Sequence, residues 1–462
     1  MSDPNAGYDV VILGGGSGGY AAAFRSAELG LKVALIEKDK VGGTCLHRGC
    51  IPTKALLHAG EVADTARESE QFGILAEFKG VDMPAVKKYK DDVVSKLYKG
   101  LQGLVKAHKV DFIQGTGTLV GPNAVQVDNG QTVTGKNVIL ATGSYSKTLP
   151  GLEIDGEKII ASEHALELTE LPNKAIVIGG GVIGVEFASA WKSLGVEVEI
   201  IEGLPRLIAA EDADSSKQLE RAFRKRGIKF HTGKFFEKVE KTATGVQVTI
   251  QGGTVVEGDI VLVAVGRGPV TAGIGYEEQG ITLDRGFVPV NESLQTSVPG
   301  VYAVGDIVPG IQLAHRGFLQ GIFVAEHIAG LNPAPIDETG IPRVTFTEPE
   351  VASMGLNEDK AKEKYGADKI KSVNYNLAGN GKSNILKTQG FIKLVAVEDG
   401  PIVGVHMVGA RISEQIGEAE LIYNWEAYAN DVAQLIHMHP TQNEAIGEAA
   451  MLLAGKPLHA HD

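Results

Sequence analysis

Short apolar runs that stop at glycine recur along the chain, and they lie at residues 10–13, 138–143, 260–266 and 296–306. Runs of this length followed by glycine are typical of buried parallel strands. Between the first two runs, the pattern predicts two helices, from about Ile51 to Glu70 and from Pro84 to His108. The pattern up to about residue 341 therefore predicts an α/β architecture with parallel sheets.

The pattern changes after Ile341. Alternating strands, such as Gly390 to Val397 and Val403 to Val408, are expected there, with a helix after each. Such a change favours a separate, antiparallel α+β domain. We place domain boundaries near residues 150, 270 and 341.

The first apolar run belongs to an internal repeat. Shifting the sequence by 165 residues superposes one glycine cluster on another and Glu37 on Glu202. Each copy has an apolar strand, a glycine turn, a helix and a second strand that ends in the acid, 18 residues after the last glycine. This context is typical of dinucleotide-binding units, so the sequence predicts two of them. The superposed glycines are Gly14, Gly15, Gly16 and Gly19, and Gly179, Gly180, Gly181 and Gly184.

Each feature of the repeat suits a dinucleotide. The glycines allow a tight turn, a close approach of backbone to pyrophosphate, and packing of helix on strand. The helix N-terminus offers free N–H groups to the phosphates. We expect Glu37 and Glu202 to accept hydrogen bonds from ribose hydroxyls. A carboxylate at Glu202 repels the 2′-phosphate of NADP, so NAD is expected, although Arg206 nearby opposes this preference.

Composition narrows the classes of function. A formal net charge of −13 disfavours nucleic acid and anionic membranes as partners, and no apolar run is long enough to span a membrane. The first residues lack the basic and apolar regions of a secretory signal, so we expect a cytoplasmic protein. The two cysteines, Cys45 and Cys50, therefore favour redox or metal chemistry over a structural disulfide. Two thiols make a poor zinc site, so redox chemistry without a metal is expected.

The spacing of the two cysteines constrains how they can bond. Residues five apart in an ideal helix have Cα atoms about 8.6 Å apart. A disulfide needs about 4.4–6.8 Å. Cys45 and Cys50 therefore cannot be bridged within a regular helix, and we expect Gly49 and Pro52 to accommodate a distortion.

The segment that runs from Gly42 to Lys54 resembles the redox-active segment of the pyridine nucleotide–disulfide oxidoreductases. That family usually has Asn where His47 stands and often Ser where Thr53 stands, and His47 is a departure that could change the electrostatics beside Cys45. Other segments that resemble the family lie at 141–143, 296–306, 346–350 and 437–444, so the resemblance covers essentially the whole chain.

The resemblance implies an α/β fold with two Rossmann-like dinucleotide-binding domains and a C-terminal α+β dimerisation domain. The FAD-binding domain would comprise residues 1–150 and 271–341. The NAD-binding domain, 151–270, would be inserted between these parts, and the interface domain would comprise residues 342–462.

The resemblance also assigns catalytic roles. Cys45 would be the interchange thiol that meets the substrate, and Cys50 the charge-transfer thiol beside the flavin. His439 would be the base that ionises the substrate dithiol, because the pKa of a histidine best suits a base at neutral pH. Glu444 would orient the imidazole of His439. Lys54 and Glu186 would pair near the flavin N5, where a cation stabilises the reduced ring.

Other interpretations of these residues stay open. Cys45 and Cys50 could be two reduced, buried thiols without a redox role. Lys54 and Glu186 could form a solvated pair at the surface. His437 and His439 could be a metal pair or ordinary surface histidines. Glu444 stands three residues after Thr441, the spacing of a capping box at a helix start.

Further residues are assigned to the cofactors by the repeat and the resemblance together. Those for FAD are Gly14, Gly16, Ser17, Gly19, Glu37, Lys38, Gly43, Thr44, Lys54, Gly117, Thr142, Gly143, Ser144, Asp306, Leu313, Ala314 and His315. Those for NAD are Gly179, Gly181, Val182, Ile183, Gly184, Glu186, Glu202 and Gly266.

Within the family, the chain is most similar to the members that oxidise dihydrolipoamide. This implies a homodimer in which a Cys45–Cys50 disulfide oxidises dihydrolipoamide on the lipoyl domains of 2-oxo acid dehydrogenase acyltransferase subunits, with electrons passing through FAD to NAD⁺. One alternative is an NAD(P)H-dependent reductase of another low-molecular-weight disulfide. A non-catalytic flavoprotein that serves as scaffold or redox sensor is the other, but holding FAD requires neither the cysteine pair nor His439.

Overall fold

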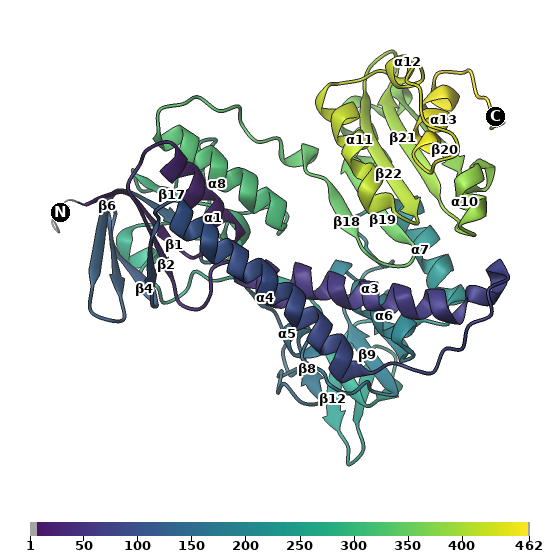
Figure 1. Cartoon of the computed structure of the whole chain (residues 1–462), viewed down its shortest axis with the longest axis horizontal. Helices are drawn as coiled ribbons and strands as arrows, with labels where there is room; N and C mark the ends of the chain where they lie inside the picture. Colours follow the sequence, from purple (N-terminus) through teal and green to yellow (C-terminus); the bar gives the residue numbers. More distant parts are fainter. Residues whose placement is uncertain (1–6, 461–462) are drawn as a thin grey trace.

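The computed structural model describes residues 7–460, which form three lobes (Figure 1). The N-terminal sheet lies in the left lobe, a second sheet in the lower lobe, and the C-terminal sheet in the upper right lobe. Two long helices, α3 (Cys50–Arg67) and α4 (Met83–Ala107), run from the left lobe towards the other two. Among the described residues, no helix is long and apolar enough to cross a membrane.

The first lobe is built on a sheet with the strand order β3-β2-β1-β6-β5-β4, in which β17 also pairs with β6. β1 pairs in parallel with β2 and β6, and the sheet core is apolar throughout, as the continuous hydrophobic run predicts for a parallel strand buried on both faces. Its strands are β1 (Tyr8–Leu13), β2 (Val33–Glu37), β3 (Asp111–Gln114), β4 (Gly117–Gly121), β5 (Ala124–Val127), β6 (Thr132–Leu140) and β17 (Val301–Ala303).

Two helices of this lobe pack unusually closely. They are α1 (Ser17–Glu28) and α8 (Ala314–Ile328). A Cβ placed on Gly321 of α8 would lie 2.3 Å from the carbonyl oxygen of Gly18 and 3.2 Å from the Cβ of Ala21. The facing positions on the two helices therefore have to stay small.

The second lobe repeats the first design with the sheet order β11-β10-β9-β15-β8. Its elements are β8 (Ile159–Ile160), α5 (Ser162–Ala165), β9 (Lys174–Ile178), α6 (Val182–Leu194), β10 (Glu197–Ile201), α7 (Ala213–Lys225), β11 (Lys229–His231) and β15 (Ile260–Val263), with a meander of β12 (Phe236–Lys241), β13 (Val246–Ile250) and β14 (Thr254–Gly258). The predicted repeat is confirmed, because α6 corresponds to α1 and β9 and β10 correspond to β1 and β2. Two short strands, β7 (Ser144–Ser146) and β16 (Arg267–Pro269), join this lobe to the first.

The C-terminal lobe has an antiparallel sheet of order β18-β19-β22-β21-β20. Its strands are β18 (Arg343–Thr345), β19 (Glu350–Gly355), β20 (Ile370–Asn376), β21 (Phe391–Val397) and β22 (Ile402–Gly409), and its helices are α9 (Glu358–Tyr365), α10 (Gly381–Ile385), α11 (Ile412–Asn424), α12 (Ala429–Val432) and α13 (Glu444–Leu453). The predicted α+β class is confirmed, but a helix after each strand is wrong. β21 and β22 pair directly across a tight turn in which Gly400 N donates to Val397 O.

Candidate functional site

The two cysteines lie on either side of a helix break. α2 (Gly43–Arg48) contains Cys45 and ends at Gly49, where φ is −142° and ψ is −113°, and α3 starts at Cys50. A Cβ on Gly49 would lie 2.9 Å from the carbonyl oxygen of Thr44, so the break needs glycine. The predicted distortion at Gly49 is therefore confirmed, whereas Pro52 continues regularly within the first turn of α3.

The expected Cys45–Cys50 disulfide is not formed in this structure, in which both cysteines are partly buried free thiols. They are nevertheless in contact, because their side chains share a hydrogen bond. That hydrogen bond, together with the charge of Lys54, lowers the pKa of Cys50 to about 7 against the opposing effect of burial. The same hydrogen bond and burial raise the pKa of Cys45 well above its ordinary value. The pair is thus a protonated Cys45 that donates to a readily ionised Cys50.

Lys54, one turn beyond Cys50, reaches an acid from the second lobe. Its Nζ lies 2.8 Å from Oε2 of Glu186 on α6, a side chain that is only 4% exposed. Two contacts with Phe346 complete the arrangement, since its backbone N–H donates to Oε1 of Glu186 at 2.9 Å and its ring lies 4.4 Å from Lys54 Nζ. The predicted pair is therefore half-buried, and a solvated surface pair is excluded.

The first glycine turn forms an open cradle at the N-terminus of α1. A Cβ on Gly14 would lie 2.2 Å from Ala141 O, and one on Gly19 would lie 1.8 Å from Gly14 O, so neither position accepts a side chain. At Gly16, the N-cap of α1, a Cβ would meet nothing within 4 Å. This space in front of free helix N–H groups fits a pyrophosphate.

Glu37, the acid predicted to bind the ribose, lies beside this cradle. Glu37 accepts hydrogen bonds from Gly15 N at 2.6 Å and Asp39 N at 2.8 Å, which fixes its carboxylate at the end of β2. Gly115 N donates to Glu37 O, which brings Gly117 close to the same strand end. A carboxylate held in this way can still accept hydrogen bonds from ribose hydroxyls through its remaining lone pairs.

The second glycine turn has the same geometry. A Cβ on Gly179 would lie 2.3 Å from Ala264 O and one on Gly184 would lie 1.9 Å from Gly179 O, whereas Gly181 and Gly266 face open space. Val182 and Ile183 start α6. Glu202 accepts from Gly180 N at 2.5 Å and from Leu204 N at 2.7 Å.

Arg206 does not turn towards Glu202. Its guanidinium donates to the carbonyl oxygens of Ala209 and Glu211, both at 3.0 Å. The cation is thereby committed to the backbone of the following loop. The structure therefore removes the opposing argument from Arg206 and leaves Glu202 as the charged group at the expected ribose position.

Most of the remaining residues assigned to FAD surround the first cradle. Ser144 Oγ donates to Asp306 Oδ2 at 2.5 Å and accepts from Arg267 Nε at 2.7 Å. The backbone of Gly43 lies against Gly16, since a Cβ on Gly43 would lie 2.7 Å from its Cα. The others are Ser17 at the start of α1, exposed Lys38 after β2, Thr44 in α2, Thr142 bonded to Val270 O and Tyr276, Gly143 at φ +74°, Leu313 as N-cap of α8, Ala314 at its first position, and His315 bonded to Pro342 O.

The predicted base and its partner meet in the C-terminal lobe. His439 Nδ1 lies 3.0 Å from Glu444 Oε1. Glu444 is the first residue of α13 and also accepts from Thr441 N at 2.8 Å, so it is both the capping acid and the partner of the histidine. The His439 side chain is 75% exposed, whereas Glu444 is 15% exposed. Within one chain, the imidazole therefore faces solvent.

His47 is bonded to backbone. Its Nε2 contacts Val41 O at 2.9 Å, and its ring packs edge-on against Tyr98. The departure from the family pattern at this position is therefore a packing contact between α2, the preceding loop and α4.

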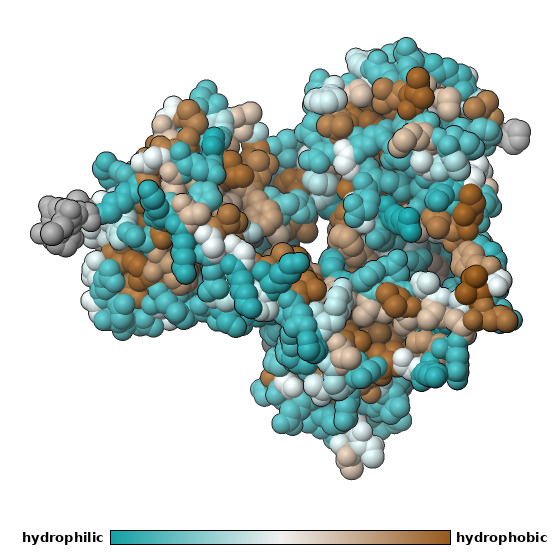
Figure 2. Space-filling view, viewed as in Figure 1, coloured by the Kyte–Doolittle hydropathy of each residue, from teal (hydrophilic) through white to brown (hydrophobic). Residues whose placement is uncertain are grey.

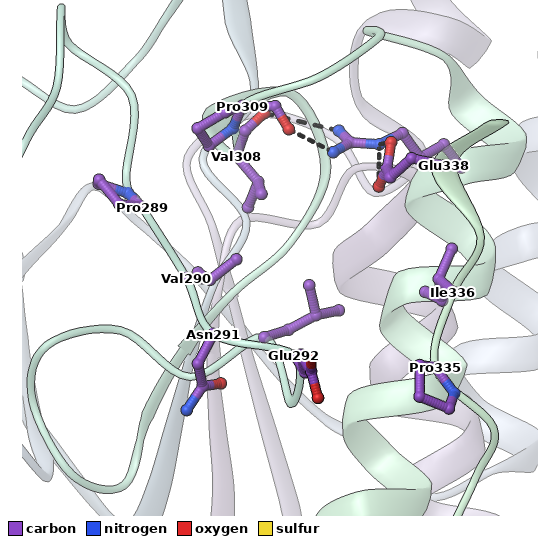
Figure 3. A pocket seen from close by; sticks show the side chains of 11 residues that line it. Pro289, Val290, Asn291, Glu292, Val308, Pro309, Pro335, Ile336 and Glu338 are labelled. Carbon is purple, nitrogen blue, oxygen red and sulfur yellow. Dashed lines mark hydrogen bonds and ion pairs between the residues drawn. The ribbon is translucent and has the colours of Figure 1, made fainter. Parts of the chain in front are cut away.

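A cavity of about 520 Å³ lies between the segment at 289–294 and the connector at 335–338 (Figure 3). Arg316 borders it, donating to Glu338 at 2.8 Å and to Pro309 O at 2.5 Å. Through these bonds, Arg316 holds the connector at 335–338 against α8. We do not assign this cavity to the site.

Sequence reasoning missed Phe346 and Arg267. Phe346 lies in a segment that resembles the family, but its backbone N–H bonds Glu186, which is 160 residues away in the sequence. No sequence pattern around Phe346 indicates this contact or the contact of its ring with Lys54. Arg267 follows the strand-ending Gly266, and its position on the short strand that pairs with β7 could have suggested a contact with Ser144.

Comparison with known proteins agrees with this geometry. Residues 8–321 match the family described as pyridine nucleotide-disulphide oxidoreductase, and residues 341–450 match its dimerisation domain. A dihydrolipoyl dehydrogenase of Bacillus subtilis is 43% identical, covering 98% of this chain and 99% of its own. The mitochondrial dihydrolipoyl dehydrogenase 1 of Arabidopsis thaliana is 41% identical, covering 99% of this chain and 92% of its own.

A solved structure is also similar along the whole length. The crystal structure of LpdA from Mycobacterium tuberculosis superposes with a TM-score of 0.89 at 28% identity, covering 96% of this chain and 99% of its own. The duplicated cradles, the cysteine pair at a helix break and the full-length matches lead to one assignment. This chain belongs to the pyridine nucleotide-disulphide oxidoreductase family.

Proposed function

We propose that the chain is a dihydrolipoyl dehydrogenase, which oxidises dihydrolipoamide and reduces NAD⁺ with FAD as its resident cofactor. The observation that carries this proposal is the cysteine pair at the α2–α3 break, in a chain that matches dihydrolipoyl dehydrogenases from end to end. The first cradle with Glu37 and Asp306 would hold FAD, and the second with Glu202 would hold NAD. Bound FAD supplies the relay that carries an electron pair from the dithiol side to NAD⁺.

The chemistry of the thiols follows from their different pKa values. Starting from the Cys45–Cys50 disulfide, a base takes a proton from the substrate dithiol, and the resulting thiolate attacks Sγ of Cys45. The disulfide bond breaks and leaves the electron pair on Cys50, whose pKa of about 7 suits it as a leaving group. The second substrate thiol then displaces Cys45, which releases the cyclic disulfide and leaves Cys45 protonated.

Residues on both sides of this step have supporting roles in the proposal. His439 takes the substrate proton, and Glu444, 3.0 Å away, orients the imidazole and stabilises its charged form. Lys54 lowers the pKa of Cys50 and provides the cation that favours the reduced flavin. Glu186 holds Lys54 in place.

We further propose that the protein works as a homodimer in which His439 of one subunit serves Cys45 of the other. The match to the dimerisation domain supports this arrangement, as does the exposure of His439. The segment around His439 also exposes three large apolar side chains, which are costly to leave in water. They are Leu435, Ile436 and Met438, which are 57%, 98% and 77% exposed. Figure 2 shows apolar patches on the visible face of the C-terminal lobe.

The remaining assignments belong to the same proposal. The domains comprise residues 1–150 with 271–341, residues 151–270 and residues 342–462, because each proposed domain contains one of the main sheets apart from the short linking strands. The protein partners are lipoyl domains of the acyltransferase subunits of 2-oxo acid dehydrogenase complexes, for which the protein is the shared third component.

The test is turnover of the purified holoenzyme with two substrate pairs. We expect rapid NADH formation from dihydrolipoamide and NAD⁺, and at least about a hundredfold lower kcat/KM for glutathione disulfide with NADH or NADPH. A reversed order would identify a reductase of another disulfide. No turnover with either pair, in a protein that is yellow from bound flavin, would favour the non-catalytic flavoprotein.

A further inference from the structure

The loop that carries His439 is tied at both ends to a single carboxylate. Glu418, on α11, lies 19 residues before the loop begins. Its Oε1 lies 2.8 Å from Nε2 of His437, at the start of the loop. Its Oε2 accepts a hydrogen bond from Nδ2 of Asn443, at the end of the loop.

These two anchors lie on either side of His439, and the second adjoins its partner. Asn443 is the N-cap of α13, and the next residue is Glu444, the partner of His439. Between the anchors, Thr441 Oγ1 donates to Met438 O at 2.7 Å, and Asn380 Nδ2 donates to Thr441 O at 2.9 Å. The loop is therefore held at its ends and at Thr441, while the imidazole of His439 is left free to meet substrate.

From this arrangement we infer that Glu418 is a positioning residue for the base, because it fixes the ends of the 437–443 loop and so the placement of His439 relative to Glu444. This inference rests on the proposed function. Glu418 touches neither His439 nor a substrate, so its effect has to pass through His437 and Asn443.

The anchor at His437 is specific and protected from solvent. The side chains of His437 and Glu418 are 11% and 19% exposed. A Cβ on Gly447 of α13 would lie 2.5 Å from His437 Nδ1, so only glycine allows the ring to approach this helix. An exposed ion pair contributes little, but a pair removed from water in this way resists screening by salt.

Charge strengthens the same anchor. The hydrogen bond to Glu418 holds the pKa of His437 above its ordinary value, against the effect of burial, and Glu444 from α13 acts in the same direction. The Leu435 backbone also accepts from the ring. A charge-assisted bond is about twice as strong as a neutral one, which makes Glu418 a stiff anchor for the loop.

The chain contains a matched control. Glu448, on α13, pairs with His459 Nδ1 at 2.7 Å, and the Glu448 side chain is 7% exposed. This is the same carboxylate–imidazole chemistry on a buried carboxylate, with a more exposed imidazole, since His459 is 56% exposed. It ties the C-terminal segment and not the His439 loop. Glu448→Ala therefore reports the general cost of losing such a pair.

The experiment compares Glu418→Ala, Glu418→Gln and Glu448→Ala as flavin-loaded holoenzymes in two half-reactions. For Glu418→Ala we expect kcat for dihydrolipoamide oxidation to fall by about ten- to a hundredfold, the scale of a displacement of about 1 Å, with little change in KM. Flavin reduction by NADH, which needs no base at His439, should stay within about twofold of wild type. Glu418→Gln can still accept from Asn443 and donate to neutral His437, so it should recover to within about fivefold.

Four results would overturn the inference. The first three are wild-type dithiol turnover in Glu418→Ala, equal loss in both half-reactions, and the same loss in Glu448→Ala. No recovery in Glu418→Gln would show that charge, and not loop placement, is what matters, which also contradicts the inference. Failure of the proposed function is distinguishable, because the wild-type protein itself would then lack dihydrolipoamide turnover.

Discussion

Replacing Cys45 tests the unequal pair of thiols directly. In the reduced protein, the pKa of Cys50 falls from its ordinary value of 9.0 to about 7, and the largest cause is the hydrogen bond with Cys45. Two pKa units correspond to about 3 kcal/mol in favour of the thiolate. At pH 7 the Cys50 thiolate fraction is then about one half, compared with about 1% for an ordinary thiol.

Two substitutions separate the hydrogen bond from the loss of the sulfur. Cys45→Ser keeps a donor, so the pKa of Cys50 should stay within about one unit of 7. Cys45→Ala removes the largest cause. Burial and the charge of Glu186 then oppose Lys54 and a backbone hydrogen bond, so the pKa of Cys50 should return to about 9 or above. Dihydrolipoamide turnover should be lost in both variants.

The assay is the pH dependence of alkylation of Cys50, measured together with the long-wavelength absorbance that a thiolate beside oxidised flavin produces. Both signals should rise with the same midpoint, near 7 in Cys45→Ser and about two units higher in Cys45→Ala. Because the folded-state pKa is lowered, the thiolate stabilises the reduced fold fully above about pH 9, and this contribution is lost as the pH falls through about 7. Equal midpoints in the two variants would refute the role of the hydrogen bond, and a band that survives in Cys50→Ser but not in Cys45→Ser would reverse the roles.

Three further predictions concern other parts of the site. His439→Gln should keep its flavin but slow the dithiol half-reaction by about 10²–10⁴, with little effect on flavin reduction by NADH; equal slowing of both by stopped flow would make the histidine structural. Lys54→Met leaves the carboxylate of Glu186, which is 4% exposed, with one backbone donor, so the free energy of unfolding measured in urea should fall by about 1–3 kcal/mol. An unchanged value would mean that the carboxylate is neutralised in some other way. NAD should exceed NADP by at least about tenfold in kcat/KM, and Glu202→Ala should narrow this ratio; equal efficiencies in wild type would show that Glu202 does not read the ribose.

The parts of the fold that could be predicted from the sequence are those that depend on residues close together in the chain. The two glycine clusters and their acids can be recognised in the sequence, because a dinucleotide-binding turn needs specific residues at fixed spacings. The helix break at Gly49 followed from the distance that two cysteines must close. Lys54 and Glu186 were paired only through a family resemblance, although their contact at 2.8 Å then proved half-buried.

Contacts between lobes left no comparable pattern. The backbone N–H of Phe346 reaches Glu186 because the C-terminal lobe packs against α6, and any residue other than proline has that donor. The two strands β21 and β22 were expected, but a helix was placed after each. Only residues 398–401 separate the two strands, which is too short for a helix, so they pair directly. Glu418 was missed because its two partners are brought to it by the packing of α11 beside the His439 loop.

The close packing of α1 against α8 has a consequence for how a duplicated unit can specialise. Ala21 in the first copy and Glu186 in the second occupy the same place in the repeat, but α8 leaves no room for a longer side chain at Ala21. The corresponding helix α6 has the loop of Phe346 beside it, which supplies a donor for an acid. After a duplication, only the second copy could therefore acquire a buried carboxylate at this position. The elements packed beside each copy therefore determine which copy can hold the acid, and through Glu186 the second copy places a charge beside Lys54 of the first.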